Sequence, residues 1–286
     1  MNMLFPHTEF SPEIQLLCAC CRVKPNDTDL KLQAALAPLI SADKLISLAI
    51  RHRVEPLLYH NLKLHAAGVF PDDILDALAV RARRNTVKSL HALRINVQLA
   101  RMLRAHGIRY LPLKGATIAQ RYYGSISLRH SNDIDFWVPA RSVEAVRALL
   151  VEQGCRPYDE YNLQKIEERG ERHRKFLREH FHHDVWIHSG GEHLELHWRI
   201  TSNARGLLLE PVDLLASGEP IDVASDSMTT MGPVPLLLYL CDHGAHHGWF
   251  RLKWLMDLPQ VLESREWDWP QVLAEASPDI SYSRNC

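Results

Sequence analysis

The stretch Ile108–Val138, IRYLPLKGATIAQRYYGSISLRHSNDIDFWV, combines several structural signals in a short length of chain. A short apolar run ends at Lys114-Gly115, and a segment of helical composition follows and ends at Gly124. A polar approach then leads to Asp133-Ile134-Asp135 and a second apolar run. We interpret the stretch as a strand, a glycine turn, a helix and a strand. Because side chains alternate along a strand, both aspartates are expected on the same face.

Two carboxylates on one face repel each other unless a cation lies between them, and oxygen ligands suit Mg²⁺. The spacing of Asp133 and Asp135 therefore favours a divalent metal site. The alternative is that both acids form structural salt bridges at the edge of a strand.

Composition limits the classes of protein to which this chain can belong. Its 286 residues are 46% hydrophobic and 23% charged, which suits one large domain or two to three small ones. A net charge of -1 gives no overall field that would attract nucleic acid or an anionic membrane. The six cysteines contain a single CxxC spacing, Cys18 to Cys21, without a second pair, and no apolar run is long enough to span a bilayer. We expect a soluble cytoplasmic protein without a signal peptide.

The order of the expected elements divides the chain into three regions. Residues 1–106 are expected to be helical, with helix starts at Ser11 and Ser41 and a long helix from Asp72 to about His106. Residues 107–232 form the expected core, and residues 233–286 a helical C-terminal region. The polar residues 160–183 fit either a helix or a loop. The last stretch shows no clear structural stop, which leaves the completeness of the C-terminus open.

A second strand pair is expected after the polar segment. Residues 184–188 and 193–199 alternate in polarity and are separated by Ser189-Gly190-Gly191-Glu192, a sequence typical of a hairpin turn. On the second strand, His193, Glu195 and His197 share one face, and the leucines share the other. Strands and helices in close succession indicate a mixed sheet.

The blocks LPLKG, YYG and LRHSNDIDFWV resemble the polymerase-β-like nucleotidyltransferases. More narrowly, the chain is similar to an uncharacterised bacterial nucleotidyltransferase family, because LELHWRI and HGAHHGWFRLKWLMDL follow in the family's order. The resemblance covers most of the sequence. It implies an α+β fold in which a polymerase-β-like core, a mixed sheet with flanking helices, lies between helical N-terminal and C-terminal regions.

The resemblance also implies an activity and a set of catalytic residues. The activity is transfer of a nucleotidyl group from an NTP, with ATP as the first choice and Mg²⁺ or Mn²⁺ as the cofactor. Asp133 and Asp135 match the family's metal-binding pair, and Glu195 matches a third carboxylate that binds metal and acts in catalysis. A structural salt bridge to an arginine is the alternative for Glu195.

Five further residues match positions near the nucleotide. Gly115 lets the backbone approach the triphosphate, and Lys114 can neutralise phosphate charge. Ala116 follows Gly115 where relatives commonly carry serine or glycine, so Thr117 is the candidate for the hydroxyl contact. Arg129 and Ser131 are candidate contacts to phosphate or base.

The acceptor stays open among a protein side chain, a small molecule, a peptide and an RNA end, as does the oligomeric state. The block from His243 to His247 suits substrate contact, core packing or helix capping equally. Two rival interpretations remain. One is a non-catalytic nucleotide-binding or partner-binding module. The other is a zinc hydrolase that uses His193, Glu195 and His197, although the chain has no HExxH motif.

Overall fold

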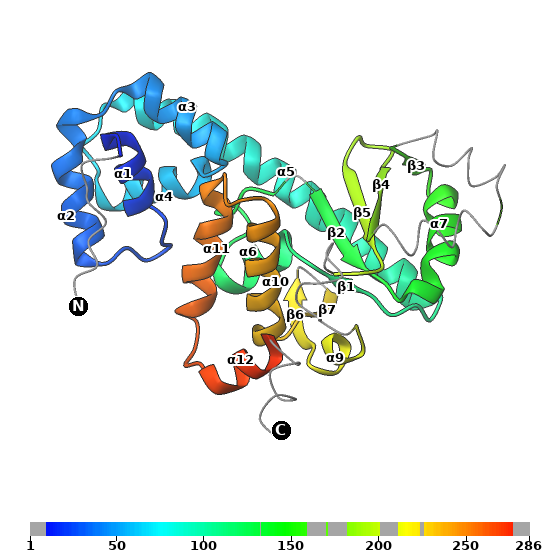
Figure 1. The fold of residues 1–286 in the computed structure, drawn as a ribbon. Coiled ribbons are helices and arrows are strands. Elements are labelled where there is room, and N and C mark those ends of the chain that lie inside the picture. Colours follow the sequence, from blue (N-terminus) through cyan, green and yellow to red (C-terminus); the bar gives the residue numbers. More distant parts are fainter. Residues whose placement is uncertain are drawn as a thin grey trace.

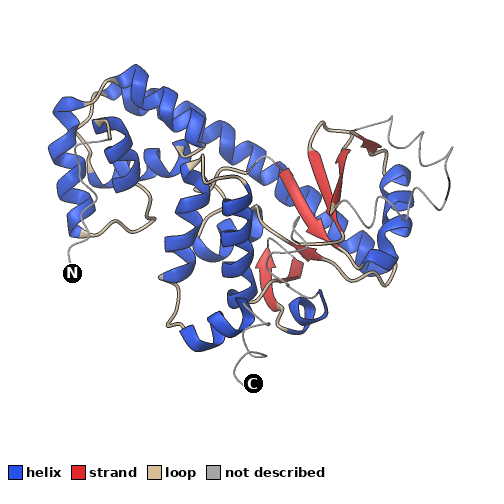
Figure 2. Cartoon of the chain, in the orientation of Figure 1, coloured by secondary structure: helices blue, strands red, loops and turns tan. Residues whose placement is uncertain are grey.

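The computed structural model combines a helical N-terminal lobe, a mixed sheet and a C-terminal group of helices (Figure 1 and Figure 2). It describes residues 10–131, 133–158, 170, 182–200, 211–223 and 226–276, and of residues 211–213 only the backbone. Most of the polar segment 160–183, whose conformation the sequence left open, lies outside the described residues.

The N-terminal lobe is built from helices, as predicted. They are α1 (Pro12–Ala19), α2 (Asp27–Leu36), α3 (Ala42–His52), α4 (Glu55–His65) and α5 (Asp72–Ala105), with a 3₁₀ turn at Ala37–Leu39. The helix starts after Ser11 and Ser41 are confirmed, although neither serine side chain makes a capping hydrogen bond. A capping box between Asn26 and Asp29 begins α2.

The long helix α5 crosses the molecule and joins its two largest hydrophobic cores (Figure 1). Its 34 residues contain no glycine or proline, which is why the helix runs uninterrupted as predicted. Leu78 near its start packs in the core of the N-terminal lobe. Leu99 and Leu103 near its end pack against the sheet. The helix therefore fixes the lobe and the sheet relative to each other.

The sheet has five strands in the order β1-β2-β5-β4-β3. The strands are β1 (Leu111–Pro112), β2 (Asp133–Trp137), β3 (Arg156–Pro157), β4 (His183–Ile187) and β5 (His193–His197). β2 and β5 are parallel, and the other neighbours are antiparallel. The predicted α+β class with a mixed sheet and flanking helices is confirmed, and so is the hairpin of β4 and β5. β1 is shorter than predicted, because Pro112 has no N–H to donate and is confined to an edge strand.

Helices and a small second sheet complete the described chain. α6 (Ala116–Tyr122) and α7 (Val143–Glu152), the latter preceded by a 3₁₀ turn at Ala140–Ser142, flank β2 in the sequence. They are followed by α9 (Pro211–Ala216), the two-stranded sheet of β6 (Glu219–Val223) and β7 (Asp226–Thr230), α10 (Pro233–His246), α11 (Leu252–Leu262) and α12 (Trp269–Ala276). α10, α11 and α12 lie within residues 233–286, where the sequence predicted helices.

The two faces of the five-stranded sheet have different surroundings. Ile134 and Phe136 of β2 and Leu196 of β5 lie in a core formed with α5 and α7. Trp137, on the opposite face of β2, lies in a core that also contains residues of α1, α4, α10 and α11. This second core therefore contains residues from all three predicted regions, and their boundaries at 106/107 and 232/233 stay a prediction.

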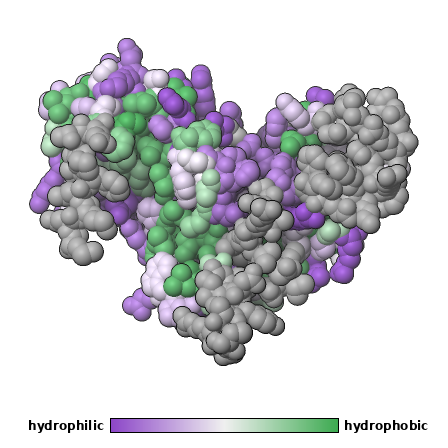
Figure 3. Space-filling view, viewed as in Figure 1, coloured by the Kyte–Doolittle hydropathy of each residue, from purple (hydrophilic) through white to green (hydrophobic). Residues whose placement is uncertain are grey.

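On the surface seen in Figure 3, hydrophobic residues gather over α11, and hydrophilic residues cover the region between the N-terminal lobe and the sheet. Among the helices that the structure describes, none combines the length and apolar character needed to cross a membrane.

Candidate active site

Two acidic side chains face each other across the central strand pair. In the parallel register of β2 and β5, Asp135 lies opposite Glu195. Their neighbours Ile134 and Leu194 face the core on the other side, as the predicted alternation requires. Asp135 is only 2% exposed. A pair of close carboxylates in such a position needs cationic partners.

Lys114 supplies one of these cationic partners. Its Nζ lies 2.8 Å from Oδ1 of Asp135 and 4.0 Å from Oε2 of Glu195. The backbone fixes this approach, because the Leu113 N–H donates to the Asp135 carbonyl oxygen. Burial alone would lower the pKa of Lys114, but the negative charges of Asp135 and Glu195 outweigh that effect and raise it. The ammonium group therefore acts as a counter-ion to both carboxylates.

His197 is the second side chain that contacts both carboxylates. Its Nε2 lies 3.3 Å from Oε2 of Glu195 and 3.6 Å from Oδ1 of Asp135. Burial favours the neutral ring, yet the two carboxylates outweigh it and raise the pKa of His197. Burial alone would raise the pKa of Asp135, because it disfavours the ionised carboxylate. Lys114 and His197 outweigh burial and hold that pKa well below its usual value. The pKa of Glu195 is raised by burial and by the charge of Asp135.

Glu195 borders a cavity of about 390 Å³ between the sheet and the C-terminal helices. Glu195 and Lys114 line it from the sheet side. The opposite wall comes from α10, α11 and the loop between them, and the end of α3 adds a further residue. The cationic and imidazole side chains on these elements are Arg53, His243, His246, His247, Arg251 and Lys253. Cations outnumber carboxylates along this wall, which suits a polyanionic ligand.

Lys253 is the cation most affected by its surroundings. Burial, together with the nearby charges of Arg129, Arg53 and Lys114, lowers the pKa of Lys253 to about 7. A bound anion would oppose these effects. Lys253 lies within the block HGAHHGWFRLKWLMDL, but the block alone does not indicate its role, because that role depends on α11 packing against the sheet.

The predicted metal ligands do not all converge. Asp135, Glu195 and His197 each offer a ligand atom, and these atoms lie within 4.8 Å of one another. Asp133 lines the same cavity and is half-buried, but among the described residues it belongs to no such group of three. Both oxygens of Asp135 are buried and, apart from their ion pairs, have no hydrogen-bond partner among the described residues. Unsatisfied buried oxygens of this kind fit a cation that the structure does not contain.

The glycine turn has the backbone geometry that the sequence predicted. Gly115 has φ +80° and ψ -126°, a conformation that side chains oppose. A Cβ atom here would lie 3.2 Å from Oγ of Ser131. The Thr117 hydroxyl donates to the Lys114 carbonyl oxygen at 3.5 Å and so closes the turn. Gly115 and Ser131 thus lie together, next to the carboxylates.

Arg129 is held away from the cavity by α11. Its Nε and Nη2 donate to the two oxygens of Asp257 at 2.7 and 2.8 Å. The Tyr123 hydroxyl donates to the same carboxylate at 2.7 Å. All three side chains are buried. The ion pair between Arg129 and Asp257 holds α11 against the loop before β2. It thereby also positions Lys253, which lies one helical turn before Asp257.

The histidines that the sequence singled out lie in two different places, one exposed and one lining the cavity. His193 is exposed and lies against Tyr158, with ring centroids 5.5 Å apart, so the zinc set of His193, Glu195 and His197 is not assembled. His243 and His247 of the C-terminal block do line the cavity. Burial and the charge of Lys114 lower the pKa of His243 to about 2.

Comparisons with known proteins give one match. The model of a family described as "Uncharacterised nucleotidyltransferase" matches residues 38–278. Comparisons with curated proteins and with solved structures give no match. The matched range contains the glycine turn, β2, β5 and the cavity wall of α10 and α11. Because the match extends over most of its length, the chain belongs to this family of uncharacterised nucleotidyltransferases.

Proposed function

We propose that the cavity transfers a nucleoside monophosphate from an NTP, with ATP as the first choice, to a hydroxyl or phosphate group of an acceptor. One observation carries the proposal. Glu195 lines a cavity whose other wall is rich in cations, and the buried Asp135 lies opposite Glu195 on the parallel neighbouring strand. Carboxylates and cations side by side suit a metal–triphosphate complex better than either charge alone.

Asp135 and Glu195 are the residues that would hold Mg²⁺ or Mn²⁺, and Asp133 lies on the same cavity. The buried Oδ2 of Asp135, which has no hydrogen-bond partner among the described residues, supports this choice. When bound, the ion neutralises developing charge on the phosphate oxygens. A nucleotide-binding module without activity would not need the raised pKa of Glu195.

Lys114 changes partners in this proposal. It lies 2.8 Å from Asp135 in the structure, where it balances the charge of the carboxylates. A metal ion would take over that task, and the ammonium would then pair with a phosphate. Gly115 allows the backbone to approach the same phosphates, since no Cβ blocks the turn.

Lys253, Arg53 and Arg251 take over the phosphate-binding role that the sequence suggested for Arg129 and Thr117. The three cations line the cavity, whereas Arg129 is fully engaged with Asp257. We assign Arg129 a positioning role, because its ion pair places Lys253. Ser131 stays a candidate contact beside the glycine turn.

Glu195 is suited to accept the proton of the attacking hydroxyl. The acceptor oxygen forms a bond to the α-phosphorus, and the bond from that phosphorus to the bridging β-oxygen breaks. Pyrophosphate leaves, and the hydroxyl proton passes to Glu195. Its side chain is 24% exposed and lines the cavity, so an acceptor hydroxyl can approach it.

The test measures Mg²⁺-dependent pyrophosphate release from each NTP, with protein, peptide, small-molecule and RNA fractions offered as acceptors. Glu195→Gln should lower the rate at least about 100-fold with nucleotide binding retained. Glu152→Gln, an exposed site at the end of α7, is the matched control and should keep the wild-type rate. Equal rates for Glu195→Gln and wild type would refute the assignment.

A further inference from the structure

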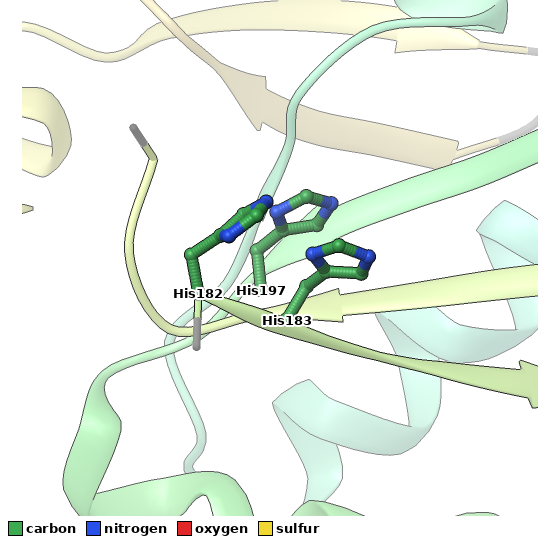
Figure 4. A group of neighbouring side chains, drawn as sticks. All are labelled: His182, His183 and His197. Carbon is green, nitrogen blue, oxygen red and sulfur yellow. The ribbon is translucent and has the colours of Figure 1, made fainter. Parts of the chain in front are cut away.

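Three histidines gather at one end of the β4–β5 hairpin (Figure 4). His182 directly precedes β4, His183 begins β4, and His197 ends β5. His183 and His197 are paired across the two strands, and their rings are stacked with centroids 4.9 Å apart. The His182 ring lies 4.3 Å from His183 and 5.9 Å from His197.

The ring nitrogens of these residues converge. Each of the three histidines offers one nitrogen, and these nitrogens lie within 4.8 Å of one another. Figure 4 shows the three rings grouped around a common space. Around one tetrahedral ion, nitrogens at roughly 2.0–2.1 Å from the metal are separated by about 3.3 Å. An approach of at most about 1.5 Å would therefore bring all three into coordination.

Unsatisfied nitrogens mark the same space. Nδ1 of His183 and Nδ1 of His197 are buried and have no hydrogen-bond partner among the described residues. A buried polar atom without a partner is costly and needs an explanation. A metal ion in the common space would give these ring nitrogens the partner that they lack.

The ring of His197 is oriented by a neighbouring carboxylate. Nε2 of His197 lies 3.3 Å from Oε2 of Glu195, which leaves Nδ1 on the side of the other two histidines. A carboxylate that orients a metal-binding histidine through its second nitrogen is a common arrangement in metal sites.

We propose that His182, His183 and His197 bind a transition metal of the Zn²⁺ type, in a site next to the carboxylates and separate from the one assigned to Mg²⁺. Three imidazoles favour such a metal over Mg²⁺, which prefers oxygen ligands. All three histidines also line the cavity, so the remaining coordination position faces it and takes water or a ligand from the cavity. The proposal does not depend on nucleotidyl transfer.

The experiment titrates the metal-free full chain with Co²⁺ in the absence of nucleotide and follows the visible absorption of the bound ion. We expect one Co²⁺ per chain, with the absorption of a tetrahedral site and displacement by Zn²⁺. His182→Ala and His183→Gln should each weaken binding at least about 100-fold, more than the loss of an orienting partner. The matched control is His193→Ala, because His193 is exposed on the same hairpin and outside the cluster. It should bind Co²⁺ like wild type.

Unfolding midpoints measured without metal establish that the variants are folded. His182 precedes the strand and is only half-buried, so its replacement is the safer of the two. Absence of Co²⁺ binding, or equal binding by His182→Ala, His183→Gln and wild type, would overturn the proposal. Binding that survives both histidine replacements but is lost in Asp135→Asn would also overturn it and would place the ion at Asp135, Glu195 and His197. None of these outcomes depends on NTP turnover, so failure here is distinct from failure of the proposed activity.

Discussion

Replacing Lys114 by methionine tests the charge balance on which the site depends. The side chain of Lys114 is 15% exposed and that of Asp135 1%, and the two are 2.8 Å apart. Loss of one partner from a buried ion pair leaves an uncompensated charge and costs roughly 3–5 kcal/mol. We expect Lys114→Met to lower the free energy of unfolding in EDTA by that amount. Lys31→Met, at an exposed site on α2, should change it by less than about 0.5 kcal/mol.

Magnesium should reverse much of this loss. In the wild type, an ion at the carboxylates must displace the Lys114 ammonium, whereas in Lys114→Met the position is open. At 100 times its dissociation constant, a ligand stabilises the folded state by about 2.7 kcal/mol. Mg²⁺ should therefore stabilise the variant more than the wild type, as measured by urea unfolding with and without the ion. Equal effects of Mg²⁺ on both proteins, together with a loss in EDTA below about 1 kcal/mol, would refute the reasoning.

The ion pair between Asp135 and Lys114 also determines how the free energy of unfolding varies with pH. The pKa of Asp135 is lowered well below its ordinary value, so its contribution to stability is present above the unfolded-state pKa and is lost as the pH falls through the folded-state pKa. The difference in unfolding free energy between wild type and Lys114→Met should therefore be largest near pH 7 and should narrow in acid.

Three further predictions concern the surroundings of the carboxylates. Asp257→Asn should cost roughly 3–5 kcal/mol in urea unfolding, because it leaves the Arg129 guanidinium buried without its counter-charge; a loss below about 1 kcal/mol would contradict this. Lys253→Met should raise stability at pH 7 and lower ATP affinity in calorimetry. Because the pKa of Lys253 is depressed to about 7, the stability of the wild type should rise between pH 7 and pH 10, where this group has lost its proton in the folded state but keeps it in the unfolded state. The variant should lack that rise. Gly115→Val should cost roughly 1–3 kcal/mol through its positive φ and weaken ATP binding with Mg²⁺ binding retained; unchanged ATP affinity would contradict it.

The strands that position the site could be predicted from the sequence because their signals are local. Alternation of polar and apolar residues placed Asp135 and Glu195 on the strand faces opposite to Ile134 and Leu194. The two glycines between β4 and β5 marked the hairpin. The long helix α5 followed from the absence of glycine and proline. In each case the relevant interactions lie within a few residues along the chain.

The cavity wall depends on contacts between distant segments and was largely missed. Lys253 lies in the quoted C-terminal block, but its role does not follow from that block, because only the packing of α11 brings it to the sheet. The partner of Arg129 is Asp257, 128 residues away, so the sequence favoured a phosphate contact where the structure has an ion pair. His182 lies at the end of a polar segment without clear periodicity. Its approach to His197 depends on the strand register.

The fate of the α-phosphate tests the central claim most directly. The protein is incubated with Mg²⁺ and ATP labelled at either the α- or the γ-phosphate, together with the fraction that supports pyrophosphate release. The account predicts label from the α-phosphate in the acceptor, γ-label only in pyrophosphate, and loss of both signals in Asp135→Asn. Transfer of the γ-label to the acceptor, or α-label transfer by Asp135→Asn at the wild-type rate, would contradict the account.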